Sequence, residues 1–144
     1  MTTAGATPPA TAVPTGQETV LLVDDDDHVR RVALRVLERL GYRVLEAADP
    51  SVALTLCSTH EGEIHLLLSD MVMPTMDGLA LSERAKALRP NINTLFMSGY
   101  APSDLTHGAR LGEGAHHIQK PFEIGALARA VRKALDAGST AAGQ

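Results

Sequence analysis

Short apolar runs in this sequence end in polar side chains whose types suit phosphoryl transfer. The first run ends in Asp24 and Asp25, and a later one ends in Asp70. Two further runs end in Ser98 and in Lys120. Short apolar runs bounded by turn residues are typical of buried parallel strands, whose carboxyl ends border a single ligand crevice. We therefore expect these five groups to lie together in that crevice.

An aspartate pair, a separate aspartate, a hydroxyl and a lysine predict a metal-assisted phosphate site. Carboxylates that are brought together repel one another, and a hard divalent cation is the usual compensation. Mg²⁺ takes one or two carboxylates and keeps positions open for phosphate oxygens. With Lys120 adding positive charge and Ser98 a hydroxyl, Asp70 is the candidate nucleophile of a phosphoryl transfer.

The remaining sequence predicts the framework that would position these groups. Apolar runs predict strands at 19–23, 43–47, 66–69, 93–98 and 116–119. Helical periodicity predicts helices at 29–40, from 50, around 81–88 and from 123, with a short or irregular helix at 104–113. Strands that alternate with helices in this way indicate an α/β domain with helices on both faces of a parallel sheet.

Composition limits the classes of protein that remain possible. The chain has 144 residues, enough for one ordinary domain, and its 44% hydrophobic and 21% charged residues are typical of globular proteins. A net charge of −4 argues against a general nucleic-acid binder. Cys57 is the only cysteine, which excludes a disulfide framework. No run approaches the ~20 apolar residues of a membrane span, and no secretory signal is visible, so we expect a cytoplasmic protein.

Both ends of the chain have a different composition from its middle. Residues 1–17 are rich in Thr, Ala, Gly and Pro, and residues 138–144 are similarly small and polar. Such segments bury too little apolar surface to offset their ordering entropy. We therefore expect a domain at 18–137 between two disordered tails, with no output domain after it.

Four pieces of the sequence together resemble the receiver domain of response regulators in two-component signalling. They are Val23-Asp24-Asp25, the stretch 69–78, Met97-Ser98-Gly99-Tyr100 and Lys120-Pro121-Phe122. They occur in the family's order and at its spacing, and the third piece is similar to receivers associated with hybrid sensor histidine kinases. The resemblance implies a flavodoxin-like, five-stranded parallel sheet in the order 2-1-3-4-5, with helices on both faces.

The resemblance also implies the roles of the site residues. Asp70 would accept a phosphoryl group from a sensor histidine kinase or a histidine phosphotransfer protein, and Ser98 and Lys120 would bind the phosphoryl oxygens. The bond between Lys120 and Pro121 is expected to be cis. The module would not be an enzyme acting on separate substrates. It would signal to an unidentified downstream protein by a conformational change, as a monomer or weak homodimer.

The expected cofactor is Mg²⁺. The resemblance assigns it to Asp24 and Asp25, with Asp25 the more direct ligand, together with Asp70 and the backbone carbonyl of Val72. The aspartate run continues through Asp26 and Asp27, which we expect in the first helical turn, where acids favour the positive end of the helix dipole.

Two further sets of residues allow more than one interpretation. His117 stands where the family commonly carries an aromatic switch residue, and it is either a surface histidine or part of a weakened, pH-sensitive switch. The arginines of the first helix form either a solvated helix face, which we expect, or an anion site; they are Arg30, Arg31, Arg35 and Arg39.

Two other functions use related residues. A phosphatase of the haloacid-dehalogenase type would pair its aspartate nucleophile with an acid two residues later, but that position is Val72. A flavodoxin-like nucleotide binder would need a phosphate loop rich in Gly, Ser and Thr after the first strand. Four aspartates occupy that place instead, and they would repel phosphate unless a metal intervened.

Overall fold

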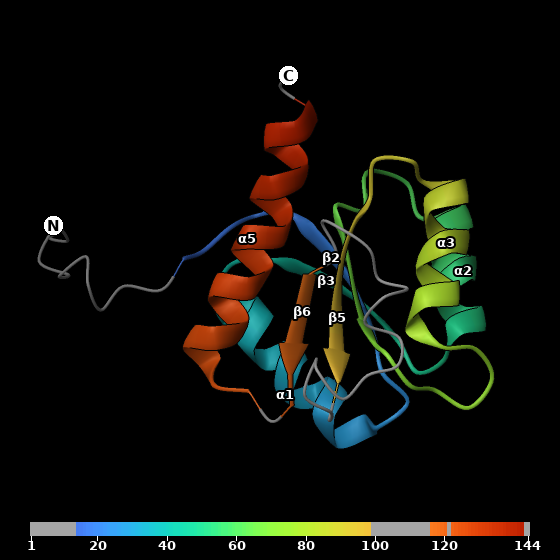
Figure 1. The fold of residues 1–144 in the computed structure, drawn as a ribbon, viewed down its shortest axis with the longest axis horizontal. Coiled ribbons are helices and arrows are strands. Elements are labelled where there is room, and N and C mark those ends of the chain that lie inside the picture. Colours follow the sequence, from blue (N-terminus) through green and yellow to red (C-terminus); the bar gives the residue numbers. More distant parts are fainter. Residues whose placement is uncertain (1–13, 99–115, 121, 143–144) are drawn as a thin grey trace, which may run out of the picture.

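A single parallel sheet positions the polar residues described above. The structure, a computed structural model, describes residues 14–98, 116–120 and 122–142, with side chains to Asp136. The five strands are β2 (Thr19–Val23), β3 (Arg43–Ala47), β4 (Leu66–Asp70), β5 (Asn93–Ser98) and β6 (His116–Gln119). They lie in the order β3-β2-β4-β5-β6, which is 2-1-3-4-5 in chain order and confirms the predicted topology (Figure 1).

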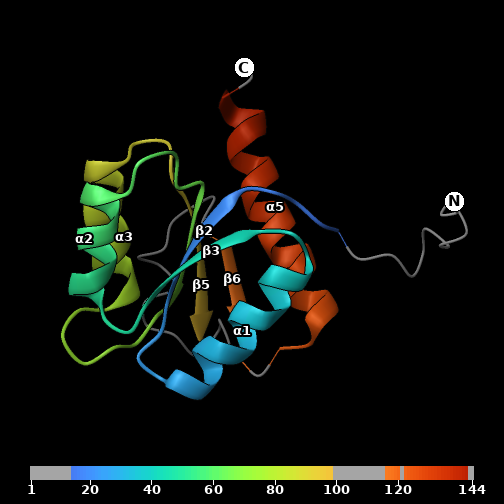
Figure 2. The ribbon, with the colours of Figure 1, turned by 180° about the vertical axis from the view of Figure 1, so that it is seen from behind.

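Helices cover both faces of the sheet. On one side lie α1 (Asp27–Arg39) and α5 (Ile124–Ala142), and on the other lie α2 (Pro50–Thr59) and α3 (Gly78–Leu88) (Figures 1 and 2). Side chains of β2 alternate between the two cores, because successive residues of a strand point to opposite faces. Val20 and Leu22 pack toward α1 and α5, whereas Leu21 and Val23 pack toward α2 and α3.

The helices begin and end where the sequence supplies capping groups. Asp26, Asp49 and Asp77 each precede a helix, and their carboxylates accept backbone N–H groups of the first turn. Pro50 opens α2 at a position where no N–H is needed. Gly41 follows the end of α1 with φ of 101°, a conformation that favours glycine. Asp26 is thus the cap of α1 and Asp27 its first residue, close to the predicted first turn.

The described structure continues past both predicted boundaries of the domain. The helix α5 continues to Ala142, past the predicted boundary at 137. Alanine has the highest helix propensity, and extending an existing helix avoids the cost of nucleation. Before β2, the Gly16 N–H donates to the Leu40 carbonyl (3.1 Å), so the backbone of this part of the expected tail packs on the domain.

Several predictions fall on residues that the structure does not describe. These are the helix at 104–113, the positions of Gly99 and Tyr100, and the cis bond before Pro121. Within the described parts of the chain, the helices are too short or too polar to cross a membrane.

Candidate functional site

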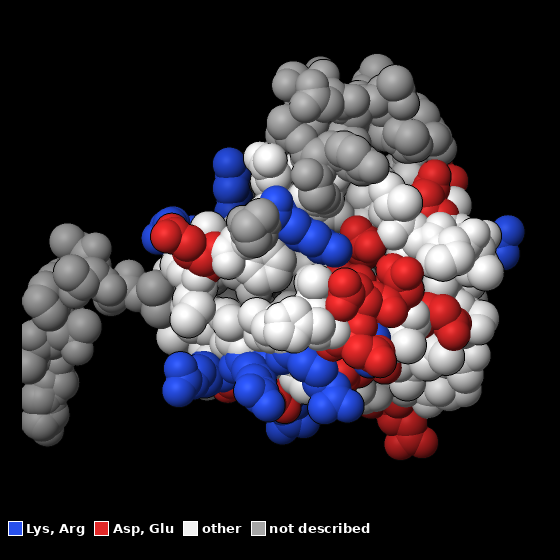
Figure 3. Space-filling model, turned by 90° about the horizontal axis from the view of Figure 1, so that it is seen from below, with Lys and Arg blue, Asp and Glu red and all other residues white. Residues whose placement is uncertain are grey.

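The predicted site lies at the edge of the sheet where the strands end. Figure 3 views this edge and shows acidic side chains gathered at its centre, with basic side chains beside them. Val23 of β2 is in register with Ser69 of β4, so Asp24 comes next to Asp70, the last residue of β4. Adjacent strands lie about 4.8 Å apart, so the sheet brings these two carboxylates together.

Three carboxylates form a set that suits a hard cation. Asp24, Asp25 and Asp70 each offer an oxygen, and these oxygens all lie within 4.8 Å of one another. Asp24 is fully buried, Asp70 is 8% exposed, and Asp25 is exposed. Carboxylate oxygens are the ligands that Mg²⁺ prefers, and the exposed Asp25 leaves one side of the set open to solvent. The donor set therefore fits the predicted metal.

Lys120 joins the two buried carboxylates. Its Nζ lies 3.0 Å from Oδ2 of Asp24 and 3.3 Å from Oδ1 of Asp70. The residue follows β6, and its backbone N–H donates to the Ser98 carbonyl (2.6 Å). The side chain therefore reaches back past the end of β5 to the two strands beyond it. One ammonium group therefore contacts carboxylates at the ends of two neighbouring strands, β2 and β4.

The charges of the site are not balanced. Burial raises the pKa of Asp70 above its ordinary value, and the negative charge of Asp24 adds to this. The ammonium of Lys120 and the backbone N–H of Val72 oppose the increase but do not cancel it. Burial alone would lower the pKa of Lys120, yet its hydrogen bond to Asp24 and the charge of Asp70 raise it. An additional cation would relieve this excess of negative charge.

The loop after Asp70 approaches its backbone closely. A Cβ atom at Gly78 would lie 2.5 Å from the Asp70 carbonyl oxygen, a distance that no side chain tolerates. The Gly78 N–H donates to the Met71 carbonyl (2.8 Å), and the carboxylate of Asp77 accepts the N–H of Ala80 (2.8 Å). Because Gly78 has no side chain, the start of α3 can lie against the backbone of Asp70 and hydrogen-bond to the loop that carries Val72.

The other predicted residues lie near the site or at its border. Ser98 is buried at the end of β5, one residue after Met97, which pairs with Asp70. The Val72 side chain is exposed. His117 lies on β6, and its Nε2 is buried without a hydrogen-bond partner among the residues that the structure describes. Burial lowers the pKa of His117, which favours the neutral form of the ring.

Sequence analysis missed the role of Arg30. The prediction that it lies on a solvated helix face is wrong, because Arg30 is only 7% exposed. Its position could have been found from helical spacing, since Arg30, Ala33 and Leu37 lie on one face and all are buried. Its NH1 donates to the backbone carbonyl of Asp24 (2.8 Å), which connects it to the acidic set.

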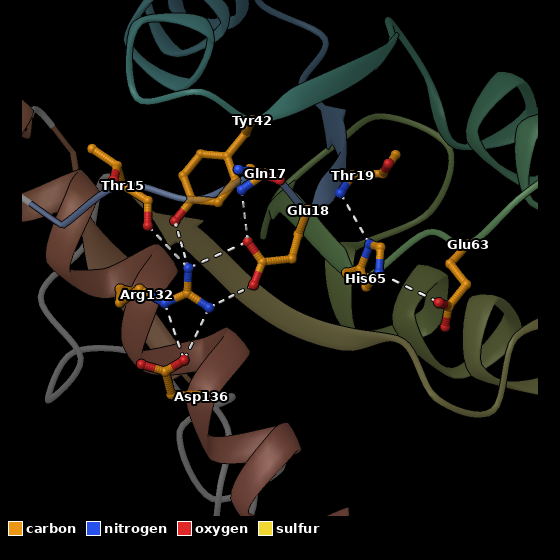
Figure 4. Close-up of polar contacts among 9 residues, drawn as sticks. All are labelled: Thr15, Gln17, Glu18, Thr19, Tyr42, Glu63, His65, Arg132 and Asp136. Carbon is orange, nitrogen blue, oxygen red and sulfur yellow. Dashed lines mark hydrogen bonds and ion pairs between the residues drawn. The ribbon is translucent and has the colours of Figure 1, made fainter.

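A second charged cluster lies at the opposite edge of the sheet, where the strands begin (Figure 4). Arg132 of α5 contacts the carboxylate of Glu18 (2.6 Å) and that of Asp136 (2.9 Å). It also donates to the Thr15 carbonyl (3.1 Å) and the Tyr42 hydroxyl (3.4 Å). The hydrogen bond from Arg132 is the main cause that lowers the pKa of Glu18.

Comparison with known proteins decides the family. The family model of the response regulator receiver domain matches residues 20–132. The chain belongs to that family. The receiver protein CpdR of Brucella abortus is 33% identical over 116 residues, which are 81% of this chain and 95% of CpdR.

A receiver from a larger protein is also similar. The sensor kinase CckA of Brucella abortus is 37% identical over 121 residues, which are 84% of this chain but only 13% of the kinase. The crystal structure of the receiver domain from hybrid histidine kinase CckA superposes with a TM-score of 0.69 and 38% identity. The match covers 81% of this chain and 98% of that one. These findings confirm the predicted resemblance to receivers of hybrid kinases and the phosphoacceptor function of the family.

Proposed function

We propose that this receiver domain takes a phosphoryl group onto Asp70 from a phosphohistidine. An Asp70 carboxylate oxygen would bond to phosphorus while the bond from phosphorus to the donor's imidazole nitrogen breaks. The electron pair of the broken bond stays on that nitrogen. The observation that carries the proposal is the position of Asp70, buried at a strand end beside Lys120 and two further carboxylates.

Neighbouring side chains would orient the reacting groups. Lys120 lies 3.3 Å from Asp70, close enough to contact a phosphoryl oxygen on that carboxylate. The Ser98 hydroxyl, on the neighbouring strand, would bind another phosphoryl oxygen. Asp24, Asp25 and Asp70, with the backbone carbonyl of Val72, would hold Mg²⁺. The bound cation would neutralise the carboxylates and the phosphoryl oxygens.

The partners follow from the same chemistry. The donor would be a sensor histidine kinase or a histidine phosphotransfer protein, a kind of partner supported by the similarity to a receiver of a hybrid histidine kinase. Phosphorylation would shift Ser98 and, through it, the region around His117, and a downstream protein would bind the shifted form. The domain would assist its own phosphorylation and hydrolysis in the cytoplasm, as a monomer or weak homodimer.

Intact mass spectrometry tests this function with a small phosphodonor. We would incubate the protein with acetyl phosphate and Mg²⁺, and compare wild type with Asp70→Asn and Asp49→Asn. Asp49 is a partly exposed helix cap, so it controls for the same chemical change away from the site. We expect one base-labile phosphoryl group on wild type and Asp49→Asn and none on Asp70→Asn. An adduct that persists in Asp70→Asn, or its absence from wild type, would overturn the proposal.

A further inference from the structure

Arg30 is a buried cation on the inner side of the acidic loop. Its guanidinium donates to three acceptors from different parts of the chain. Nε reaches Glu46 of β3 (3.1 Å), NH1 reaches the backbone carbonyl of Asp24 (2.8 Å), and NH2 reaches Asp27 at the start of α1 (2.7 Å). The forked guanidinium is the side chain whose geometry allows such divergent contacts. Arg30 therefore connects β3 and α1 to the loop that follows β2.

The contact with Asp24 constrains its neighbour Asp25. The peptide group that joins the two residues is planar, so a hydrogen bond to the Asp24 carbonyl also fixes the nitrogen of Asp25. On the far side of Asp25, the Asp26 N–H donates to Oδ1 of Asp24 (2.9 Å). Asp25 thus lies between two anchored peptide groups, although its own side chain is exposed to solvent.

We infer that Arg30 is a positioning residue for the metal site and holds Asp25 where its carboxylate can meet those of Asp24 and Asp70. This inference rests on the proposed function, because it concerns the cation that phosphoryl transfer would use. Removing a residue that contacts a metal ligand without itself binding the metal typically weakens metal affinity by about 10- to 100-fold. We expect an effect at the lower end of that range, because Arg30 acts on Asp25 through the backbone.

Electrostatics alone predicts the opposite result, which makes the inference testable. Removing a positive charge near a cation site should tighten cation binding. Arg31, the next residue on α1, is exposed and carries the same charge. Substitutions Arg30→Met and Arg31→Met therefore make the same change in net charge, but only the first removes the contact with Asp24. Methionine also keeps most of the side-chain length, which limits the cavity that the change leaves.

Mg²⁺ binding to the unphosphorylated protein, measured by isothermal titration calorimetry, provides the readout. We expect Arg30→Met to bind about 10-fold more weakly than wild type, and Arg31→Met to bind equally well or more tightly. Arg30→Lys keeps the charge without the fork, and we expect its affinity between those of Arg30→Met and wild type. Thermal unfolding in chelator measures the structural effect of each variant separately.

The outcomes separate this inference from the proposed function. Failure of wild type to bind Mg²⁺ would contradict the metal site itself. Binding by wild type together with equal or tighter binding by Arg30→Met would overturn the role of Arg30 alone. If Arg30→Met does not fold, Arg30→Lys decides: wild-type affinity in that variant would overturn the inference, and weaker affinity in a folded protein would support it.

Discussion

The two edges of the sheet carry clusters of opposite character. At the edge where the strands begin, Arg132 contacts Glu18 and Asp136, and the pKa of Glu18 falls. At the edge where they end, Lys120 contacts Asp24 and Asp70, and the pKa of Asp70 rises despite that contact. In both clusters a cationic side chain lies within ion-pair distance of two carboxylates. The direction of the carboxyl pKa shift separates a partly exposed cluster, in which the hydrogen bond from Arg132 dominates, from a buried cluster, in which desolvation dominates.

The largest expected effect comes from removing the cation of the buried cluster, Lys120. Lys120→Met leaves the buried carboxylates of Asp24 and Asp70 facing each other without a counter-charge. Loss of one partner of a buried pair costs about 3 kcal/mol. We expect the free energy of unfolding, from urea titration at neutral pH in chelator, to fall by that amount. Recovery of part of the loss on addition of Mg²⁺ would support the comparison, and an unchanged stability would contradict it.

The corresponding change in the partly exposed cluster around Arg132 should have a smaller effect. Arg132→Met removes contacts that are partly exposed, and such ion pairs contribute up to about 1 kcal/mol. We expect unfolding in urea to show a loss of about that size. Mg²⁺ should restore none of it, and phosphorylation by acetyl phosphate should proceed as in wild type. A loss of phosphorylation in a folded Arg132→Met protein would show that the two edges are coupled.

The pH dependence of stability should have opposite signs at the two edges. The lowered pKa of Glu18 means that the native state binds fewer protons than the unfolded chain as acid is added. Its contribution is therefore present above the ordinary carboxyl pKa and is lost as pH falls through the lowered native value. The raised pKa of Asp70 has the reverse effect, and stability falls as pH rises from the ordinary value through the native one.

Two variants test the predicted signs of this pH dependence of stability in metal-free protein. Glu18→Gln should be less stable than wild type near neutrality, and the difference should shrink on acidification. Asp70→Asn should be more stable than wild type near neutrality, and that difference should also shrink on acidification. Urea unfolding between about pH 3 and about pH 7 covers the ordinary carboxyl range. A destabilised Asp70→Asn at neutral pH would show that Lys120 outweighs burial and the charge of Asp24.

The smallest effect is expected at His117, which belongs to neither cluster. Its buried Nε2 lacks a partner among the described residues, and an unsatisfied buried polar atom costs about 1 kcal/mol or more. We expect His117→Phe to raise the free energy of unfolding by up to about 1 kcal/mol. Thermal unfolding of the two proteins side by side measures the change. A destabilised His117→Phe would mean that the larger ring does not fit beside Phe96, its register partner on β5.

A residue's place in the fold could be predicted from the sequence where a short local pattern determines it. Asp70 could be predicted because an apolar strand, a terminal carboxylate and a turn follow one another directly, and the structure extends β4 to include it. Arg30 was missed because a charge on a helix was assigned to solvent before its place beside Ala33 and Leu37 was considered. The hydrogen bond from Gly16 to Leu40 joins residues that are distant in the sequence, so composition does not reveal it.

The cluster around Arg132 also has a mechanical consequence. Through Arg132, the last helix is fastened to the Thr15 carbonyl and to Glu18, immediately ahead of the first described strand. A pulling force applied to the chain ahead of Thr15 would reach these bonds before it reached the sheet. The edge of the sheet where the strands end, which carries the acidic loop, would then bear less of a force applied along this segment.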